Sequence, residues 1–211
     1  MSALGFVHLF EPATRPDADT LLLLHGTGGD EHDLLGLGRT LAPGAALLSP
    51  RGKVDENGAG RWFRRVREGV FDVDDVIRRA HELGDFVEEA AGAYGVDPSG
   101  LTAVGFSNGA NIAAALLLLR PGLLRAAVLL APAAPLQGRR PEPVDLTGTR
   151  VFVGAGTSDP ITPLDQAELL VEQLRERGAD VWLRTHAGGH APSPEVVADA
   201  RTWLAGPRPA S

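Results

Sequence analysis

The sequence predicts an α/β protein with a mostly parallel central sheet and helices on both of its faces. Short, wholly apolar segments alternate with longer amphipathic ones along the chain. The continuous apolarity of the short segments is typical of strands that are buried on both faces, as in a parallel sheet. Strands that alternate with helices also imply right-handed crossovers. The chain of 211 residues is long enough to bury a full core, so we expect one domain over residues 1–211.

Six segments have the composition of buried strands. They are residues 20–26, 45–50, 101–106, 126–132, 150–156 and 180–186. In open parallel sheets, ligands bind beyond the carboxyl ends of the strands. We therefore expect functional side chains where these segments end, and five polar residues lie there: His25, Ser49, Ser107, Asp159 and His190.

The longer segments have the periodicity of amphipathic helices. Residues 72–95 begin with acidic side chains, which suit the positive end of a helix, and Gly95 is a plausible C-terminal cap. Residues 164–177 repeat the pattern up to Gly178, and Ser193-Pro194 predicts the N-cap and first position of a last helix. The expected buried stripes are Val76, Ala80, Leu83, Val87, Ala90 and Tyr94; Ala167, Leu170, Val171 and Leu174; and Val196, Val197, Ala200 and Leu204.

The composition argues against several classes of function. The net charge of −7, from 20 basic and 27 acidic residues, disfavours nucleic acid or an anionic membrane as the main partner. The absence of cysteine excludes disulfides, thiolate zinc sites and cysteine nucleophiles. No signal peptide is evident, and charged residues, Pro121 and Gly122 interrupt the apolar stretch 112–135. We expect a cytoplasmic protein without membrane insertion, and a homodimer is compatible with the sequence.

The stretch AVGFSNGANIAAALLLL, residues 103–119, places a single serine between a predicted strand and a predicted helix. Residues Gly105 to Gly109 match the pattern G-x-S-x-G. A tight turn at this point strains the backbone of the serine, requires small neighbours, and exposes the hydroxyl near the positive end of the next helix. The alternative interpretation is a glycine-rich turn. The flanking strand and helix favour Ser107 as a nucleophile.

A serine nucleophile needs a base, and the base needs an orienting carboxylate. His190 lies in a glycine-flanked loop after the last strand and is the favoured base, with His186, at the end of that strand, as the alternative. Asp159 follows a buried strand and is the favoured acid, although Ser-Asp-Pro is also strong turn chemistry. The competing acids are Asp145, which precedes the strand, and Asp165, which falls inside the next helix.

Such a site also needs backbone donors for a developing oxyanion. The amide of Asn108, directly after the serine, is one candidate, and Thr27 in the turn after the first apolar strand is the other. This turn, shaped by Gly26, Gly28 and Gly29, lacks both common glycine patterns of phosphate-binding loops. His25 is expected to brace it. A metal site in this region would have as its ligands His25, Asp30, Glu31, His32 and Asp33. We disfavour it, because acidic residues at the start of a helix are also explained by the helix dipole.

Five segments in order, LLLLHGTGGDEHDL, GRWF, GFSNGANIA, GTSDPITP and GGHAPSPE, resemble the phospholipase/carboxylesterase family of α/β-hydrolases, which includes acyl-protein thioesterases. The form GFSNGANIA together with ENGAGRWFRR is most similar to a bacterial subgroup linked to quinone stress. The resemblance implies an α/β-hydrolase fold. It also implies a triad of Ser107, Asp159 and His190 with oxyanion donors at Thr27 and Asn108.

Two positions differ from the thioesterase-like members of this family. They usually have Gln at the position of Asn108, and an acidic residue where this chain has Arg64-Arg65. Trp62, Phe63 and Ile161 are the expected apolar walls of the substrate pocket, and ordinary core packing is the alternative. The basic residues within 51–67 predict a solvated loop that could favour anionic substrates.

These observations predict a serine carboxylesterase that needs no cofactor and no metal. About 18 residues join the strand that ends near Pro132 to the one that begins near Arg150, which is too short for a large lid domain. We therefore expect an open cleft, and small-molecule short-chain or aryl esters as substrates. Thioesterase or lysophospholipase-type activity at the same site is the alternative, followed by a non-catalytic binding protein, because a fold alone does not establish chemistry.

Overall fold

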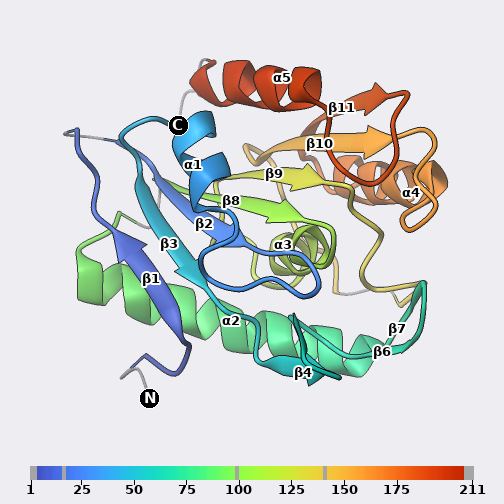
Figure 1. Cartoon of the computed structure of the whole chain (residues 1–211), viewed down its shortest axis with the longest axis horizontal. Helices are drawn as coiled ribbons and strands as arrows, with labels where there is room; N and C mark the ends of the chain where they lie inside the picture. The colour runs from blue at the N-terminus through green and yellow to red at the C-terminus, as the bar shows by residue number, and fades with distance from the viewer. Residues whose placement is uncertain (1–3, 16–17, 98–99, 140–141, 207–211) are drawn as a thin grey trace.

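The computed structural model describes residues 4–15, 18–97, 100–139 and 142–206. Its main sheet has seven strands in the order β1-β3-β2-β8-β9-β10-β11, and only β1 runs antiparallel to its neighbour (Figure 1). The strands are β1 His8–Glu11, β2 Thr20–Leu24, β3 Ala46–Pro50, β8 Leu101–Phe106, β9 Ala126–Leu130, β10 Arg150–Gly156 and β11 Asp180–His186. The predicted fold class, a mostly parallel sheet of the α/β-hydrolase type, is confirmed.

Helices cover both faces of this sheet. They are α1 Leu35–Leu41, α2 Val73–Tyr94, α3 Asn108–Leu119, α4 Leu164–Arg175 and α5 Pro194–Ala205. Helices α1 and α5 pack on one face and α2, α3 and α4 on the other, which gives two separate buried clusters (Figure 1). Helix α3 has an almost entirely buried surface, because it lies between the sheet and α2. The helix that follows Ser107 is thus held by core packing along its length.

Local signals set the helix ends as the sequence indicates. The Asp72 side chain accepts a hydrogen bond from the Asp75 amide at the start of α2, and Gly95 ends that helix with φ of 65°. Ser193 caps α5 through the Val196 amide at 3.3 Å, with Pro194 at the first helical position. The strand predicted over 20–26 ends at Leu24, and the one predicted over 126–132 ends at Leu130.

Burial differs from the predicted stripes at the edges of the molecule. Tyr94, predicted to belong to the buried stripe of its helix, is 37% exposed and stacks on Phe10 at the outer strand β1. In α5 the buried residues include Trp203, whereas the predicted Val197 and Leu204 are only half-buried. Trp182 in β11 is 45% exposed, because β11 is an edge strand and only partly covered. Apolar composition alone does not distinguish an edge strand from a central one.

The basic segment 51–67, predicted to be a solvated loop, contributes to two antiparallel hairpins. The first pairs β4 Val54–Glu56 with β5 Ala59–Arg61, and the second pairs β6 Arg65–Arg67 with β7 Val70–Phe71. Asn57-Gly58 turns the first hairpin with positive φ at both residues, the signature of a type I′ turn. The Asn-Gly pair is a hairpin signal that the prediction of a solvated loop overlooked. The hairpins lie beside the end of the sheet where β8 meets α3 (Figure 1).

The connection between β9 and β10 contains turns and no helix in its described residues, 131–139 and 142–149. A large lid is therefore not evident at this position, as expected from its length. None of the helices in the described part of the chain has the length and apolarity needed to cross a membrane.

Candidate active site

Ser107 occupies a sharp turn between β8 and α3. Its φ of 52° and ψ of −116° lie outside the regions that non-glycine residues commonly adopt. The Ser107 amide donates to the carbonyl of Leu130 at 2.8 Å, and the Ser107 carbonyl accepts from the Asn111 amide at 3.0 Å. The neighbouring strand and the first turn of α3 thus hold the strained residue in place.

The two glycines of G-x-S-x-G are needed for close approach of the backbone. A Cβ at Gly105 would lie 2.5 Å from the carbonyl oxygen of Gly109, and a Cβ at Gly109 would overlap the carbonyl of Leu24 at the end of β2. Both glycines therefore let α3 begin close to the ends of β2 and β8. This contact places the serine at the carboxyl edge of the sheet.

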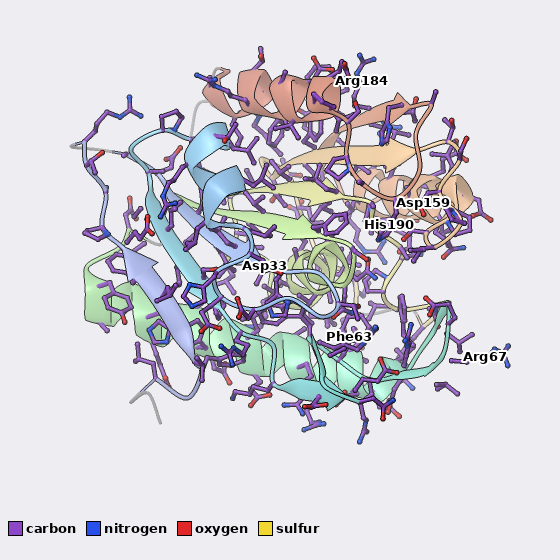
Figure 2. All side chains as sticks on the ribbon, viewed as in Figure 1. Asp33, Phe63, Arg67, Asp159, Arg184 and His190 are labelled. Carbon is purple, nitrogen blue, oxygen red and sulfur yellow. The ribbon has the colours of Figure 1, made fainter. Side chains whose placement is uncertain are left out.

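His190 joins Ser107 to Asp159 through two hydrogen bonds. The His190 Nε2 lies 2.9 Å from the Ser107 Oγ, and the His190 Nδ1 lies 2.7 Å from the Asp159 Oδ2. The three residues come from the ends of β8, β10 and β11, and Figure 2 shows Asp159 and His190 side by side. An imidazole held in this way can accept the serine proton at Nε2 while Nδ1–H faces a carboxylate.

Asp159 is held as an anion in a buried position. Burial raises the pKa of this carboxyl, but hydrogen bonds from the Thr162 amide, from His190 and from the Ile161 amide outweigh it, so the net pKa is lowered. The amides of Thr162 and Ile161 donate to the Asp159 Oδ1 at 3.0 and 2.8 Å, respectively, which leaves Oδ2 for the imidazole. The Asx-type turn and the role toward His190 are thus compatible at this residue.

The competing residues lie elsewhere. The Nδ1 of His186 accepts from the Gly188 amide, and Asp145 bonds Thr147 in its own loop. Asp165 lies exposed in the first turn of α4. The structure brings none of these three side chains into the chain of hydrogen bonds at Ser107.

Thr27 and Asn108 line the cleft in front of Ser107, and within the described part of the chain neither of their amides donates to a protein acceptor. The end of strand β5 and the residue after it bond to the side chains of both Thr27 and Asn108. The Arg61 Nη1 donates to the Thr27 Oγ1 at 2.8 Å, and the Trp62 amide donates to the Asn108 Oδ1 at 2.8 Å. The Gly28 amide bonds the carbonyl of Gly60 at 2.8 Å. The β4–β5 hairpin therefore fixes both amides relative to each other.

His25 has the bracing position that the sequence predicts. Its Nδ1–H donates to the Gly26 carbonyl at 2.7 Å, and its Nε2 accepts from the Gly52 amide at 2.9 Å. Burial lowers the pKa of His25, which outweighs the opposing effects of the Gly26 carbonyl and nearby acids. The neutral tautomer with the proton on Nδ1 makes both bonds. It thereby joins the glycine turn to the segment that precedes β4.

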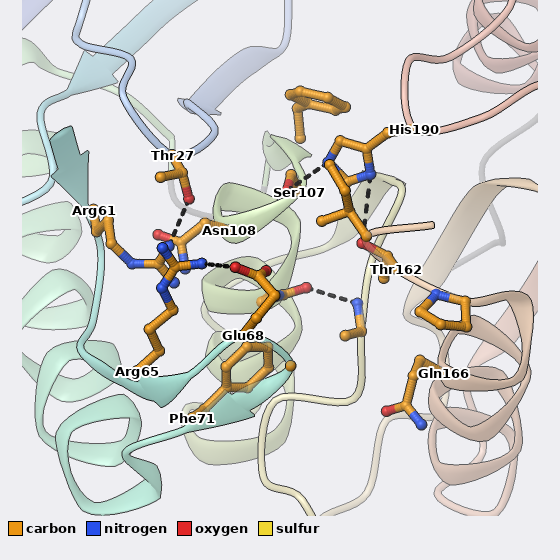
Figure 3. Close-up of a pocket in the computed structure, with 16 residues that line it drawn as sticks. Thr27, Arg61, Arg65, Glu68, Phe71, Ser107, Asn108, Thr162, Gln166 and His190 are labelled. Atoms are coloured by element: carbon orange, nitrogen blue, oxygen red, sulfur yellow. Dashed lines mark hydrogen bonds and ion pairs between the residues drawn. The ribbon is translucent and has the colours of Figure 1, made fainter. Parts of the chain in front are cut away.

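A cleft of about 340 Å³ opens above Ser107 (Figure 3). Ile161 lies in its lining, as expected, and is 51% exposed. Trp62 and Phe63 do not line it: they are 2% and 0% exposed and belong to the core under the hairpins, which is the alternative interpretation of the sequence. The aromatic lining comes instead from Phe71 and Phe106, which the sequence analysis did not identify.

Charged side chains gather at one end of the cleft. Figure 3 shows Arg61, Arg65 and Glu68 on the side of Thr27, opposite His190. Arg65 donates through Nε to Glu56 at 3.0 Å and through Nη1 to Glu68. Arg61 is 3% exposed, and its Nε lies 3.3 Å from the Glu56 Oε2. Of the basic residues that were predicted to be solvated, Arg61 and Arg65 are thus buried or half-buried and paired, whereas Arg51, Lys53, Arg64 and Arg67 are exposed as predicted.

Comparisons with known proteins show the family to which this chain belongs. The family model described as Phospholipase/Carboxylesterase matches residues 8–206. The Bacillus subtilis (strain 168) protein MhqD, classed by name as a hydrolase, is 45% identical over 93% of this chain and 96% of its own. The crystal structure of a Bacillus cereus carboxylesterase is 41% identical, with a TM-score of 0.93 over 97% of this chain and 95% of that one. A carboxylesterase from Mesorhizobium loti is 34% identical, with a TM-score of 0.91 and 98% of each chain covered.

Proposed function

This chain belongs to the phospholipase/carboxylesterase family of α/β-hydrolases, and from that premise we propose that it cleaves short-chain or aryl carboxylic esters with a triad of Ser107, His190 and Asp159. Membership makes it a serine hydrolase that acts on carboxylic ester bonds. The observation that carries the choice of residues is the continuous run of hydrogen bonds from the Ser107 Oγ through His190 to Asp159.

In the proposed reaction, the Ser107 Oγ attacks the ester carbonyl carbon while its proton passes to the His190 Nε2. The carbonyl oxygen becomes an oxyanion in the tetrahedral intermediate. The bond to the alcohol oxygen then breaks, and the imidazolium returns the proton to that oxygen. Water attacks the resulting acyl-enzyme by the same sequence of proton transfers, which releases the acid and restores Ser107.

Two features of the protein stabilise the charges that develop. The anionic Asp159 supports the imidazolium and fixes the tautomer with Nδ1–H, since its Oδ2 lies 2.7 Å from that nitrogen. Thr27 and Asn108 line the cleft, and their amides have no protein acceptor in the described residues, so they are available to the oxyanion. In other serine hydrolases the removal of one such donor costs about 10²–10³-fold in rate.

The size and openness of the cleft support small substrates. A volume of about 340 Å³ accommodates a short acyl group and an aromatic alcohol, and the described residues between β9 and β10 add no helix over it. We expect kcat/KM for p-nitrophenyl esters to be highest among acetate to hexanoate and to fall toward palmitate. The Ser107→Ala protein provides the blank. A steady rise up to palmitate would contradict the proposed substrate class.

A further inference from the structure

The buried Arg61 presents one unused guanidinium nitrogen to the cleft. Its Nη1 donates to the Thr27 Oγ1 and its Nε to the Phe63 carbonyl, whereas Nη2 has no protein partner among the described residues. The side chain is nevertheless only 4% exposed, and Arg61 lines the cleft. The Nη2 atom is not among the buried side-chain atoms that lack a partner, so it reaches solvent and is free to donate to a ligand that enters the cleft.

Arg65 places a second cation beside it. Burial lowers the pKa of Arg61, and the positive charge of Arg65 lowers it further. Glu56 lies between the two guanidiniums, 3.0 Å from the Nε of Arg65 and 3.3 Å from the Nε of Arg61. One carboxylate therefore faces two cations, which leaves a net positive charge here before Glu68 is counted.

Glu68 supplies that second carboxylate in this structure. It bonds the Nη1 of Arg65, although its own side chain is 68% exposed. Its backbone lies in the turn between β6 and β7, and Gln137 fixes this hairpin by bonding the Phe71 amide and the Gly69 carbonyl. The hairpin can thus stay in place while the Glu68 side chain turns into solvent.

We propose that Glu68 occupies the position of a substrate carboxylate, and that the preferred esters carry a carboxylate which replaces Glu68 on Arg65 and also reaches the Nη2 of Arg61. This inference rests on the proposed esterase function and names the substrate class of the same site. The carboxylate belongs to either the acyl or the alcohol part of the ester, since both extend from the reacting carbonyl into the cleft.

Replacement of Glu68 by a substrate carboxylate is favourable, because Glu68 gives up a weak ion pair and the substrate gains stronger hydrogen bonds. An exposed ion pair is worth about 0.2–1 kcal/mol, so Glu68 gives up little when it moves into water. A substrate carboxylate that meets two guanidiniums gains charge-assisted hydrogen bonds, which are roughly twice as strong as neutral ones. A cationic substrate would meet the same two arginines and is disfavoured.

Two matched pairs of esters test the proposal and distinguish the acyl from the alcohol side. Phenyl hydrogen adipate is compared with phenyl hexanoate, and 4-acetoxybenzoate with 4-methylphenyl acetate. The readout is the ratio of kcat/KM for the anionic ester to that for its neutral partner. The variants are Glu68→Gln and Arg65→Gln. The matched control is Arg67→Gln, because Arg67 is exposed, does not line the cleft, and points away from the molecule in Figure 2.

In at least one pair, we expect Glu68→Gln to raise the ratio about three- to fivefold, as expected for loss of one competing exposed ion pair. Arg65→Gln should lower it about tenfold through loss of a charged hydrogen-bond donor. Arg67→Gln should leave it unchanged. The pair that responds identifies the part of the ester that carries the carboxylate. A ratio that Glu68→Gln leaves unchanged or lowers in both pairs overturns the proposal, even if Arg65→Gln does not fold.

Hydrolysis of the neutral esters separates this proposal from the proposed function. If the neutral esters are cleaved but the ratio does not respond to Glu68→Gln, only the carboxylate subsite is wrong. If no ester is cleaved, the esterase proposal fails, and calorimetric binding of 4-acetoxybenzoate to the Ser107→Ala protein still decides the subsite. Adding Glu68→Gln should then tighten binding about three- to fivefold, and unchanged or weaker binding contradicts the subsite.

Discussion

At the scale of single residues, the two oxygens of Asp159 have separate tasks. Oδ1 accepts the amides of Ile161 and Thr162, and Oδ2 accepts from the His190 Nδ1. The sequence favoured Asp159 as the acid because it follows a buried strand, and offered turn chemistry at Ser-Asp-Pro as the alternative. The structure shows why both are compatible: the turn uses one oxygen and leaves the other facing the imidazole.

Asp159→Asn should lower kcat by about 10⁴-fold while the protein stays folded. The Asn side chain keeps the shape and can still accept from the turn amides through its oxygen. Its NH₂ group then faces His190, which favours the tautomer that is protonated at Nε2 and cannot take the Ser107 proton. The measurement is kcat for phenyl acetate at pH 7.5. Asp165→Asn, at an exposed position in α4, is the control, and an equal loss there would contradict this role.

His25 predicts how stability changes with pH. Burial lowers the pKa of His25 below the ordinary value of 6.5, so the folded state keeps it neutral. As the pH falls below about 6.5, the unfolded chain binds a proton at this residue and the folded protein does not, so the free energy of unfolding decreases. The slope from this one group is at most about 1.4 kcal/mol per pH unit.

Urea unfolding at pH 7.5 and pH 5.5 measures this effect. The wild-type protein should lose more stability between the two pH values than His25→Gln, which has no group that titrates there. The variant is expected to be less stable at pH 7.5, because the bonds to Gly26 and Gly52 change. Equal losses in the two proteins would show that His25 does not contribute to the pH dependence.

At the scale of elements, the junction of β8 and α3 depends on backbone contact. Gly109→Ala should destabilise the protein by about 1–3 kcal/mol, as overpacked sites do, because its Cβ would overlap the carbonyl of Leu24. Gly92→Ala, in α2 with open space around it, should instead stabilise by about 0.4–1 kcal/mol. Urea unfolding should give these opposite signs. A neutral Gly109→Ala with full esterase activity would contradict the close-approach explanation.

The elements that could be predicted from the sequence are those with a local signal. Asp72, Gly95 and Ser193 mark helix ends through hydrogen bonds or a backbone conformation that few residue types provide. The hairpins of residues 54–71 were missed, because their strands are two or three residues long and show no apolar alternation. Asn57-Gly58 was the one signal available. Since these hairpins form one side of the cleft, the missed elements led to the wrong assignment of Trp62 and Phe63 as pocket walls, whereas Ile161 was correct.

At the scale of the whole molecule, the site is assembled from distant parts of the chain. Ser107, Asp159 and His190 follow three strands that lie in the order β8, β10 and β11, with β9 between the first two. Their position at strand ends could be predicted from the alternation of elements, because parallel strands present their carboxyl ends at one edge. The burial of Trp62 and Phe63 in the core could not be predicted from the sequence, since an apolar aromatic residue suits both a core and a pocket wall.

The central claim, that Ser107 is an activated nucleophile, is tested most directly by labelling the native protein with a fluorophosphonate and locating the adduct by peptide mass spectrometry. The account predicts one label on Ser107, none after Ser107→Ala or heat denaturation, and unchanged labelling after Ser158→Ala, at an exposed serine next to Asp159. A native, folded protein that takes no label at Ser107, or that remains labelled after Ser107→Ala, would contradict it.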